Sequence, residues 1–319
     1  MKKMLKYFAA STVLGLAFLR VSLAATGDLQ VLHAFAPSTQ GGSRPTSAPI
    51  EQAGILYGMT PYGGVSNYGV IYSVRLSDLH YTNLYAFRGP DGQHPFGSLL
   101  GYAGQFYGMT SQGGTNEDGV IFRISPAGGD YTILHQFNDQ DEMDGAAPWS
   151  SLVESNGVLY GTTYNGGTNN RGVVFSLLPD GSGYTNLHRF RGGAADGKHS
   201  KGDLLVDGSM LYGMTCEGGG FNAGTVFAMG IDGQSFTNLV EFTGMPGNGR
   251  NPCGRLAKIE STLYGLVHST EGNAGSIFGV STEGGAASFL KAFSGGVDDG
   301  GVPEGSLTRY ASKLFGMTR

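Results

Sequence analysis

Short apolar runs, separated by glycine-rich and polar turns, recur along the chain at a nearly fixed interval. The clearest block is LYGMTPYGGVSNYGVIYSV at residues 56–74, and similar blocks stand at 106–124, 159–177, 211–229 and 263–280. The glycine of the aromatic-glycine pair falls at positions 58, 108, 161, 213, 265 and 316, so the repeat length is 50 to 53 residues. Apolar runs this short, bounded by Gly, Asn, Asp and Pro, predict strands rather than helices.

Two further runs complete each unit. One has the form YTNLYAF and stands at 81–87, 131–137, 184–190, 236–242 and 287–293. The other has the form HPFGSLL and stands at 94–100, 147–153, 199–205, 251–257 and 302–308. A parallel β-helix coil is about half this length, whereas a β-propeller blade takes about 40–50 residues and four antiparallel strands. The sequence therefore predicts an all-β chain folded as a β-propeller of about six four-stranded blades, the last of them incomplete.

The predicted domain spans residues 25–319. Its units lie near 45–87, 95–137, 148–190, 200–242, 252–293 and 303–319. LQVLHAF at 29–35 resembles the fourth strand of a unit, so we expect it to close the last blade and remove an open sheet edge. The sequence ends at Arg319, after the second strand of the sixth unit. That leaves two interpretations open, a fragment of a longer product or a three-stranded final blade.

The first 24 residues form a separate segment. Lys2, Lys3 and Lys6 precede an apolar run at 7–18, and Ser22-Leu23-Ala24 offers small residues for cleavage after Ala24. This three-part pattern predicts a secretory signal peptide. The alternative is a short membrane anchor, but the run is well short of the ~20 apolar residues that a spanning helix needs. We therefore expect export to the periplasm, the cell surface or the medium, with no membrane span in the mature chain.

Charge and cysteine content narrow the choice of partners. Charged residues make up 14 % of the chain, the net charge is −5, and no basic run follows the N-terminus. This composition argues against nucleic acid and anionic membrane surfaces as partners. Cys216 and Cys253 are the two cysteines of the sequence. In an exported chain an even count favours a disulfide between them; the alternative is two free cysteines packed as small apolar residues.

The repeated motifs carry a family resemblance. LYGMTxxGGxxNxGVIF, YTxLHxF and DGxxPxxxL resemble the GloVer tandem-repeat family of exported bacterial proteins over about residues 28–319. The succession of strand, Gly-Gly turn, strand and aromatic strand is also similar to kelch propellers, as a looser analogy. The resemblance implies an exported repeat protein, often with a C-terminal surface anchor. It implies no established chemistry or cofactor.

A ligand site is expected where the loops between units enter the first strands, at the mouth of a propeller channel. The residues expected there are Phe96, Trp149, Lys201, Arg255 and Glu304. Trp149, the single tryptophan, would anchor a sugar or a peptide, or would pack between blades. The same loops carry Asp91, Asp144, Asp196 and Asp299, each followed directly by glycine. These aspartates would contact the ligand or, as we favour, form turns.

Metal and catalytic signals are weak. Asp139, Asp141 and Asp144 crowd one loop and could hold calcium, although the distal bidentate glutamate of an EF-hand is missing; a solvated acidic loop is the simpler interpretation. His33, His135 and His188 share one repeat position and would be spread over different blades. The sequence contains no GxSxG, HExxH or P-loop motif. We expect neither a metal nor a cofactor.

Two functions remain in view. The first is an exported binding or structural scaffold for a glycan or protein. The second is a polysaccharide-active or other hydrolytic enzyme with its site at the channel mouth. Carboxylates within about 5–10 Å of each other would favour the enzyme, and an exposed aromatic side chain with dispersed carboxylates would favour binding. For the fold itself, we expect Gly161 to let the adjacent blade approach and Gly166 to lie in a tolerant, exposed turn.

Overall fold

The computed structural model describes residues 31–35, 41–245, 248–269, 274–296, 299–303, 305–310 and 313–318. The predicted signal peptide and Glu304 lie outside these ranges. The chain divides into two compact units. Of the described residues, the N-terminal unit holds those from 31 to 170 and from 175 to 186, and the C-terminal unit holds those from 171 to 174 and from 187 to 318.

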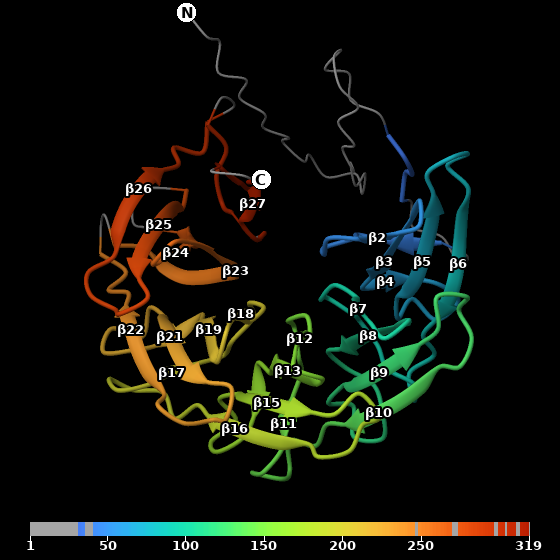
Figure 1. The fold of residues 1–319 in the computed structure, drawn as a ribbon, viewed down its shortest axis with the longest axis horizontal. Coiled ribbons are helices and arrows are strands. Elements are labelled where there is room, and N and C mark those ends of the chain that lie inside the picture. Colours follow the sequence, from blue (N-terminus) through green and yellow to red (C-terminus); the bar gives the residue numbers. More distant parts are fainter. Residues whose placement is uncertain are drawn as a thin grey trace, which may run out of the picture. The chain divides into compact units, whose positions relative to one another are not determined.

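Strands are the one regular element of the described residues, and in every four-stranded sheet the strand order follows the chain (Figure 1). The first three sheets are β2 (Ile50–Gln52), β3 (Ile55–Thr60), β5 (Val70–Arg75) and β6 (Tyr81–Ala86); β7 (Leu100–Tyr102), β8 (Gln105–Thr110), β9 (Val120–Ile124) and β10 (Thr132–Gln136); and β12 (Val153–Ser155), β13 (Val158–Thr162), β15 (Val173–Leu177) and β16 (Thr185–Arg189).

The remaining sheets belong to the second half of the chain. They are β18 (Leu205–Asp207), β19 (Met210–Thr215), β21 (Thr225–Gly230) and β22 (Thr237–Glu241); β23 (Arg250–Ile259), β24 (Thr262–Ser269), β25 (Ser276–Ser281) and β26 (Ser288–Ala292); and the two-stranded β27 (Thr308–Tyr310) and β28 (Lys313–Phe315). The repeat length read from the sequence thus corresponds to one four-stranded sheet. After β26, the described residues contain these two further strands.

Short two-stranded ladders join the segment before a sheet to the turn between that sheet's second and third strands. The ladders pair β1 (Gly42–Ser43) with β4 (Tyr62–Gly63), β11 (Gly145–Ala146) with β14 (Asn165–Gly166), and β17 (Gly197–Lys198) with β20 (Glu217–Gly218). A single bridge between Gln93 and Gln112 occupies the same place in the second sheet. These ladders hold together two kinds of loop, the loop before a sheet and the turn between its second and third strands. We call the surface that they form in each unit the loop face.

The glycine of each second strand makes room for an aromatic ring of the third strand. Gly108 pairs in register with Phe122, and a Cβ at position 108 would lie 2.5 Å from Cζ of that ring. The ring is fully buried and meets Phe87, at the end of the preceding sheet, with ring centroids 5.6 Å apart. Gly161 has the same relation to Phe175. The expectation that this glycine admits the neighbouring blade directly was therefore wrong, because the space belongs to a ring of its own sheet.

Gly166 also differs from expectation. It is buried in β14 with φ of +79°, and a Cβ there would lie 2.4 Å from the carbonyl carbon of Gly145. A left-handed backbone and a backbone neighbour in β11 both exclude a side chain. The position is not a tolerant turn.

The described N-terminal residues 31–35 form no strand, although we expected one at 29–35. They contact the first sheet through side chains. Leu32 and Phe35 are buried against Val70 and Tyr72, and the ring of His33 stacks on Tyr81 with centroids 4.0 Å apart. The segment is held by this packing rather than by strand hydrogen bonds.

The predicted disulfide is absent, and neither Cys216 nor Cys253 is disulfide-bonded. Cys253 lies in β23, and its thiol donates a hydrogen bond to the carbonyl of Pro303 at 3.0 Å. Cys216 follows β19 and is buried, and burial raises the pKa of its thiol to about 11. Each sulfur thus has surroundings of its own in the C-terminal unit, and both act as the small packed side chains of the alternative interpretation.

Candidate functional site

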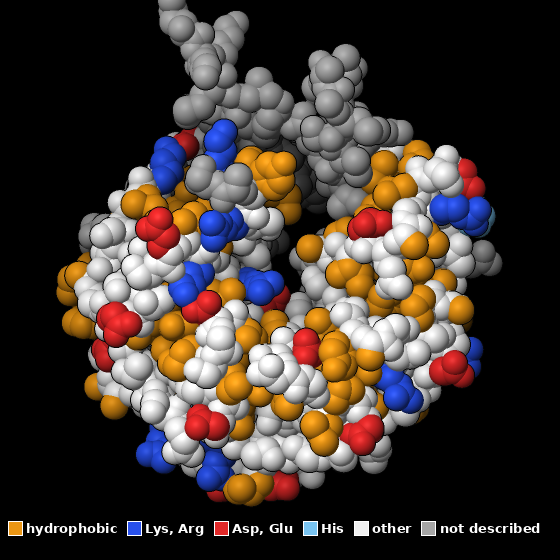
Figure 2. Space-filling model, viewed as in Figure 1, with side chains coloured by type: hydrophobic (Ala, Val, Ile, Leu, Met, Phe, Trp, Pro, Cys, Tyr) orange, Lys and Arg blue, Asp and Glu red, His pale blue; other side chains and the backbone are white. Residues whose placement is uncertain are grey.

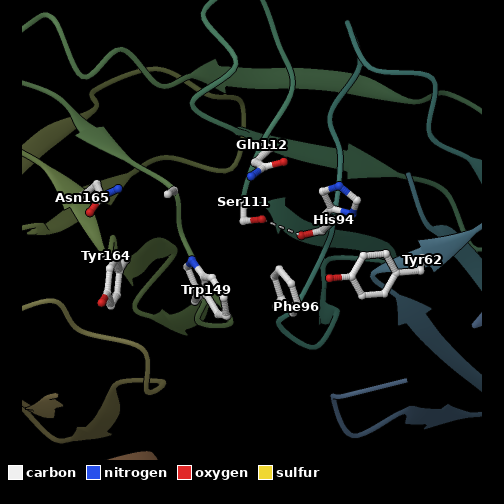
Figure 3. Close-up of a pocket in the computed structure, with 9 residues that line it drawn as sticks. Tyr62, His94, Phe96, Ser111, Gln112, Trp149, Tyr164 and Asn165 are labelled. Carbon is white, nitrogen blue, oxygen red and sulfur yellow. Dashed lines mark hydrogen bonds between the residues drawn. The ribbon is translucent and has the colours of Figure 1, made fainter. Parts of the chain in front are cut away.

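An open pocket of about 340 Å³ lies on the loop face of the N-terminal unit (Figure 3). Its lining comes from the loops and turns of three consecutive sheets. The lining residues are Tyr62, His94, Phe96, Ser111, Gln112, Ala147, Trp149, Tyr164 and Asn165. All nine belong to the N-terminal unit.

Two repeat positions supply most of the lining. The platform position is the third residue of the HPF-type segment, and the turn position is the fourth residue after the glycine of a sheet's second strand. The platform position is held by Phe96, Trp149, Lys201 and Cys253, and the turn position by Tyr62, Gln112, Asn165 and Glu217. Because the fold repeats, side chains about 50 residues apart in the sequence meet at one place.

Four aromatic rings stand in a row along one side of the pocket, in the order Tyr164, Trp149, Phe96, Tyr62 (Figure 3). Phe96 and Trp149 stack with ring centroids 4.3 Å apart and an interplanar angle of 1°. Tyr164 lies 6.0 Å from Trp149, and Tyr62 lies 6.4 Å from Phe96, nearly perpendicular to it. All four side chains are half-buried. The central pair is therefore fixed from both sides while its outer edges stay accessible.

Backbone hydrogen bonds fix the two loops that carry this pair. His94 and Ala147 each precede a proline and adopt the left-handed region, with φ of 54° and 49°. The N–H of His94 donates to the carbonyl of Tyr68, and the N–H of Ala147 donates to the carbonyl of Asp118, each at 2.8 Å. The left-handed residue turns the chain sharply, so that the platform residue two positions later points into the pocket.

Polar groups face the row of rings from the other side of the pocket (Figure 3). His94 Nδ1 lies 2.8 Å from the carbonyl oxygen of Pro61. A carbonyl only accepts, so Nδ1 carries the proton and Nε2 remains available to a ligand. The hydroxyl of Ser111 donates to the His94 carbonyl at 3.0 Å. Within the described part of the chain, the side-chain amides of Gln112 and Asn165 make no hydrogen bond to protein.

The predicted site aspartates lie elsewhere. Each binds the side chain of a fourth-strand residue, with contacts of 2.6 Å from Tyr85 to Asp91, 3.0 Å from His135 to Asp144, 3.1 Å from His188 to Asp196 and 2.7 Å from Lys291 to Asp299. Each also accepts a backbone N–H from the start of its own loop, donated by Arg88, Asn138, Arg191 and Ser294. These carboxylates fasten the loops and do not line the pocket. Contact with a ligand therefore gains no support.

Aromatic stacking completes these fastenings. His135 stacks on Tyr184 with centroids 3.9 Å apart. Burial, followed by the nearby Asp144 carboxylate, raises the pKa of Tyr184 well above its usual value. Burial and the hydrogen bond to Asp91 likewise raise the pKa of Tyr85. Both phenols therefore stay protonated and uncharged at neutral pH.

The other predicted site residues belong to the C-terminal unit. Lys201 holds the platform position of its own sheet and is exposed. Arg255 is also exposed but stands two residues beyond that position, which Cys253 occupies. The acidic loop shows no metal arrangement: Asp141 accepts the N–H of Met143, and no group of three or more metal-ligating side chains occurs among the described residues.

Sequence reasoning found Phe96 and Trp149 but missed the rest of the lining. Tyr62, Gln112 and Asn165 share the turn position, and Ser111 and Tyr164 directly precede it in their sheets. The small ladders bring those residues against the platform position. Aligning the repeats, and then asking which equivalent positions lie on the same surface, could have found them.

The repeated four-stranded antiparallel sheets define the class of protein, a β-propeller. A solved structure with this fold is similar: a chain from the crystal structure of a nidogen/laminin complex superimposes with a TM-score of 0.51 at 15 % identity, covering 82 % of this chain and 84 % of that one. TolB from Acinetobacter baumannii gives 0.46 at 12 % identity, over 82 % of this chain and 59 % of TolB. At such identity the nidogen/laminin likeness shows the fold alone.

The family follows from the sequence match. The Gloeobacter/Verrucomicrobia repeat matches residues 14–143 and again 140–319, so this chain belongs to that repeat family. No curated protein matches the sequence. The repeat family and the propeller fold fit a binding or scaffold protein. In the described residues no helix is long and apolar enough to span a membrane.

Proposed function

We propose that this protein is an exported binding scaffold and that the aromatic pocket of the N-terminal unit is its ligand site. The observation that carries the proposal is the convergence of four aromatic side chains from three repeats on one open pocket. Half-buried aromatic rings beside unpaired amides are typical of a surface that takes up a ligand. A purely structural repeat would have no need to place them together.

Binding is favoured over hydrolysis by the chemistry of the lining. Glycoside hydrolysis requires two carboxyl groups, about 5–10 Å apart, on either side of the scissile bond. None of the nine lining residues carries a carboxylate. The aspartates of the neighbouring loops are held by fourth-strand side chains and backbone N–H groups. The pocket therefore offers contact surface and hydrogen bonds, and no acid–base pair.

The proposed location and partner rest on separate support. The pattern of residues 1–24 supports export, so the ligand would be an extracellular glycan or protein. A protein partner draws support from the nidogen/laminin complex, in which a chain of similar fold is part of a protein assembly. The low charge and acidic balance of the sequence argue against nucleic acid.

Trp149 allows a direct test because it is the single tryptophan of the sequence. Its fluorescence would be titrated with a neutral polysaccharide set (dextran, xylan and laminarin), with polygalacturonate, and with a proline-rich decapeptide. We expect at least one probe to change the emission saturably. Asn165→Glu should abolish the change while the protein stays folded, because Glu217 stands at the same turn position of the next sheet. Lys201→Ala should leave the response intact.

A flat response to every probe, or a response that survives Asn165→Glu, would overturn the proposed site. Release of reducing sugar from the same polysaccharides would instead support the hydrolytic alternative.

A further inference from the structure

We propose that the ligand of the aromatic pocket is an uncharged carbohydrate, held by the side-chain amides of Gln112 and Asn165 against the edges of Phe96 and Trp149. This inference rests on the proposed function, since it names the class of ligand for the same site. Four features of the pocket lead to it: its charge, its free hydrogen-bonding groups, its two-sided polarity and its backbone.

The pocket carries no fixed charge. Its lining contains no Asp, Glu, Lys or Arg, and His94 and the two tyrosines are its titratable groups. A phosphate, a carboxylate or an ammonium group entering it would lose water without gaining a counter-charge from any lining residue, which is costly. The Arg44 guanidinium lies outside the lining, 5.4 Å from the centroid of the Tyr62 ring. The lining therefore selects an uncharged ligand over an acidic polysaccharide or a charged peptide.

The two primary amides of the lining indicate that the ligand carries hydroxyl groups. Gln112 and Asn165 hold the turn position in adjacent sheets, and within the described residues their amides have no protein partner. A primary amide offers both a donor and an acceptor. Neighbouring hydroxyls of a sugar ring also donate and accept, so one amide can bind two of them. His94 Nε2 adds a further acceptor, since Nδ1 is committed to Pro61.

The pocket is apolar on one side and polar on the other, as a sugar ring is. The four rings form one side and Gln112 stands across from them, while His94 packs against Tyr62 at one end of the row with ring centroids 5.0 Å apart (Figure 3). Because Phe96 and Trp149 cover each other's faces, they offer edges, with a phenol group at each end of the row. The apolar side of a pyranose would make van der Waals contact with these edges while its hydroxyls face the amides. A volume of about 340 Å³ leaves room for a mono- or disaccharide unit.

The backbone around the pocket argues against an extended peptide. Peptides that add to a sheet need a run of open backbone N–H and C=O groups. Here Tyr62 and Asn165 lie in two-residue ladders that are already paired, and Gln112 is bridged to Gln93. His94 and Ala147 are left-handed and cannot continue a strand. Recognition must therefore come from side chains.

The test compares ligand classes and variants on the full mature chain. The probes are cello-, xylo-, malto- and laminari-oligosaccharides, an oligogalacturonate of similar length and a proline-rich decapeptide, titrated against Trp149 fluorescence with calorimetry as a check. We expect at least one neutral oligosaccharide to bind and the charged one to bind at least tenfold more weakly. Gln112→Ala and Asn165→Ala should each weaken binding by about tenfold, as loss of one or two hydrogen bonds implies.

Glu217→Ala is the matched control, since it removes the side chain from the same repeat position in the C-terminal unit. It should leave the dissociation constant unchanged, and unchanged melting temperatures would show that all three variants are folded. Binding of the decapeptide or the oligogalacturonate without any neutral sugar would overturn this inference and leave the proposed function standing. Failure of every probe would overturn both. Neutral-sugar binding that is indifferent to Gln112→Ala and Asn165→Ala would refute the assigned role of the amides.

Discussion

The loop faces of the two units use the same repeat positions for different chemistry. In the N-terminal unit, Phe96 and Trp149 hold the platform position and build an uncharged pocket. In the C-terminal unit, the platform position carries Lys201 and Cys253. Glu217, at the turn position there, lies 3.0 Å from Lys198 and 3.6 Å from His199. One surface is aromatic, the other is ionic.

The backbone under these two surfaces is the same. Gly145–Ala146 pairs with Asn165–Gly166 as Gly197–Lys198 pairs with Glu217–Gly218. Burial by itself would raise the pKa of Glu217, but Lys198 and His199 hold it below its usual value, so this carboxylate stays ionised. On the face in Figure 2, Lys and Arg side chains gather over β23 and its neighbours, and hydrophobic side chains are frequent over β2 to β10. The repeat therefore fixes geometry, and each unit's loop face carries its own chemistry.

The largest effects should come from changing the shared backbone. Gly161→Val and Gly213→Val each place a branched side chain where even a Cβ would lie 2.5 Å and 2.3 Å from a buried phenylalanine ring. Phe175 and Phe227 are fully buried and cannot yield, so overpacking should cost ~1–3 kcal/mol or more in each unit. Urea unfolding of both variants measures this cost.

The companion substitution is Gly166→Ala, which meets the Gly145 backbone and a left-handed φ. It should also destabilise, by about 1–2 kcal/mol, from the unfavourable left-handed conformation alone. For the two valine variants, an unchanged unfolding midpoint in either one would show that the third-strand ring does not fill the space beside that glycine. The claim that both units share this backbone packing would then be wrong.

The sequence was sufficient for the frame but not for the surface built on it. Strand runs and glycine spacing predict the four-stranded sheets because hydrophobic alternation and turn chemistry are local properties. Pairing between β11 and β14 joins residues about 20 positions apart, and no local signal marks it. The lining residues Tyr62 and Tyr164 were missed for this reason. The predicted disulfide between Cys216 and Cys253 was wrong because an even number of cysteines does not determine where each thiol points.

An intermediate effect is expected at the fastenings behind the pocket. His135→Phe keeps the stack on Tyr184 but removes the contact to the buried Asp144, whose loop leads to Trp149. Leaving that carboxylate short of a partner should cost about 1–3 kcal/mol. It should also shift the emission of Trp149 to longer wavelength as the loop loosens. His135→Tyr should restore part of the lost stability and part of the emission shift, because Tyr85 makes the equivalent bond to Asp91 with its own hydroxyl.

His188→Phe is the matched control, because it breaks the same contact with Asp196 in the C-terminal unit. It should lower stability by a similar amount and leave the Trp149 spectrum unchanged. If both variants shifted the spectrum equally, the His135 contact would be a general stabiliser and would have no specific role in positioning the pocket.

The smallest effect should come from the left-handed residues that aim the platform side chains. Ala147 and Asn251 hold this position in the two units with φ of 49° and 53°, each before a proline. The Cβ of alanine makes the left-handed conformation unfavourable in free energy, whereas asparagine tolerates this region. Ala147→Gly should therefore raise the free energy of unfolding by about 0.5–1 kcal/mol, after the greater freedom of glycine in the unfolded chain is subtracted. Asn251→Gly should change it by less, and denaturant midpoints at matched protein concentration resolve the difference.

A loss of stability in Ala147→Gly would mean that the Ala147 Cβ, at the pocket wall, contributes more through packing than it costs through strain. The platform would then depend on local contacts in each unit rather than on the backbone turn that the repeats share.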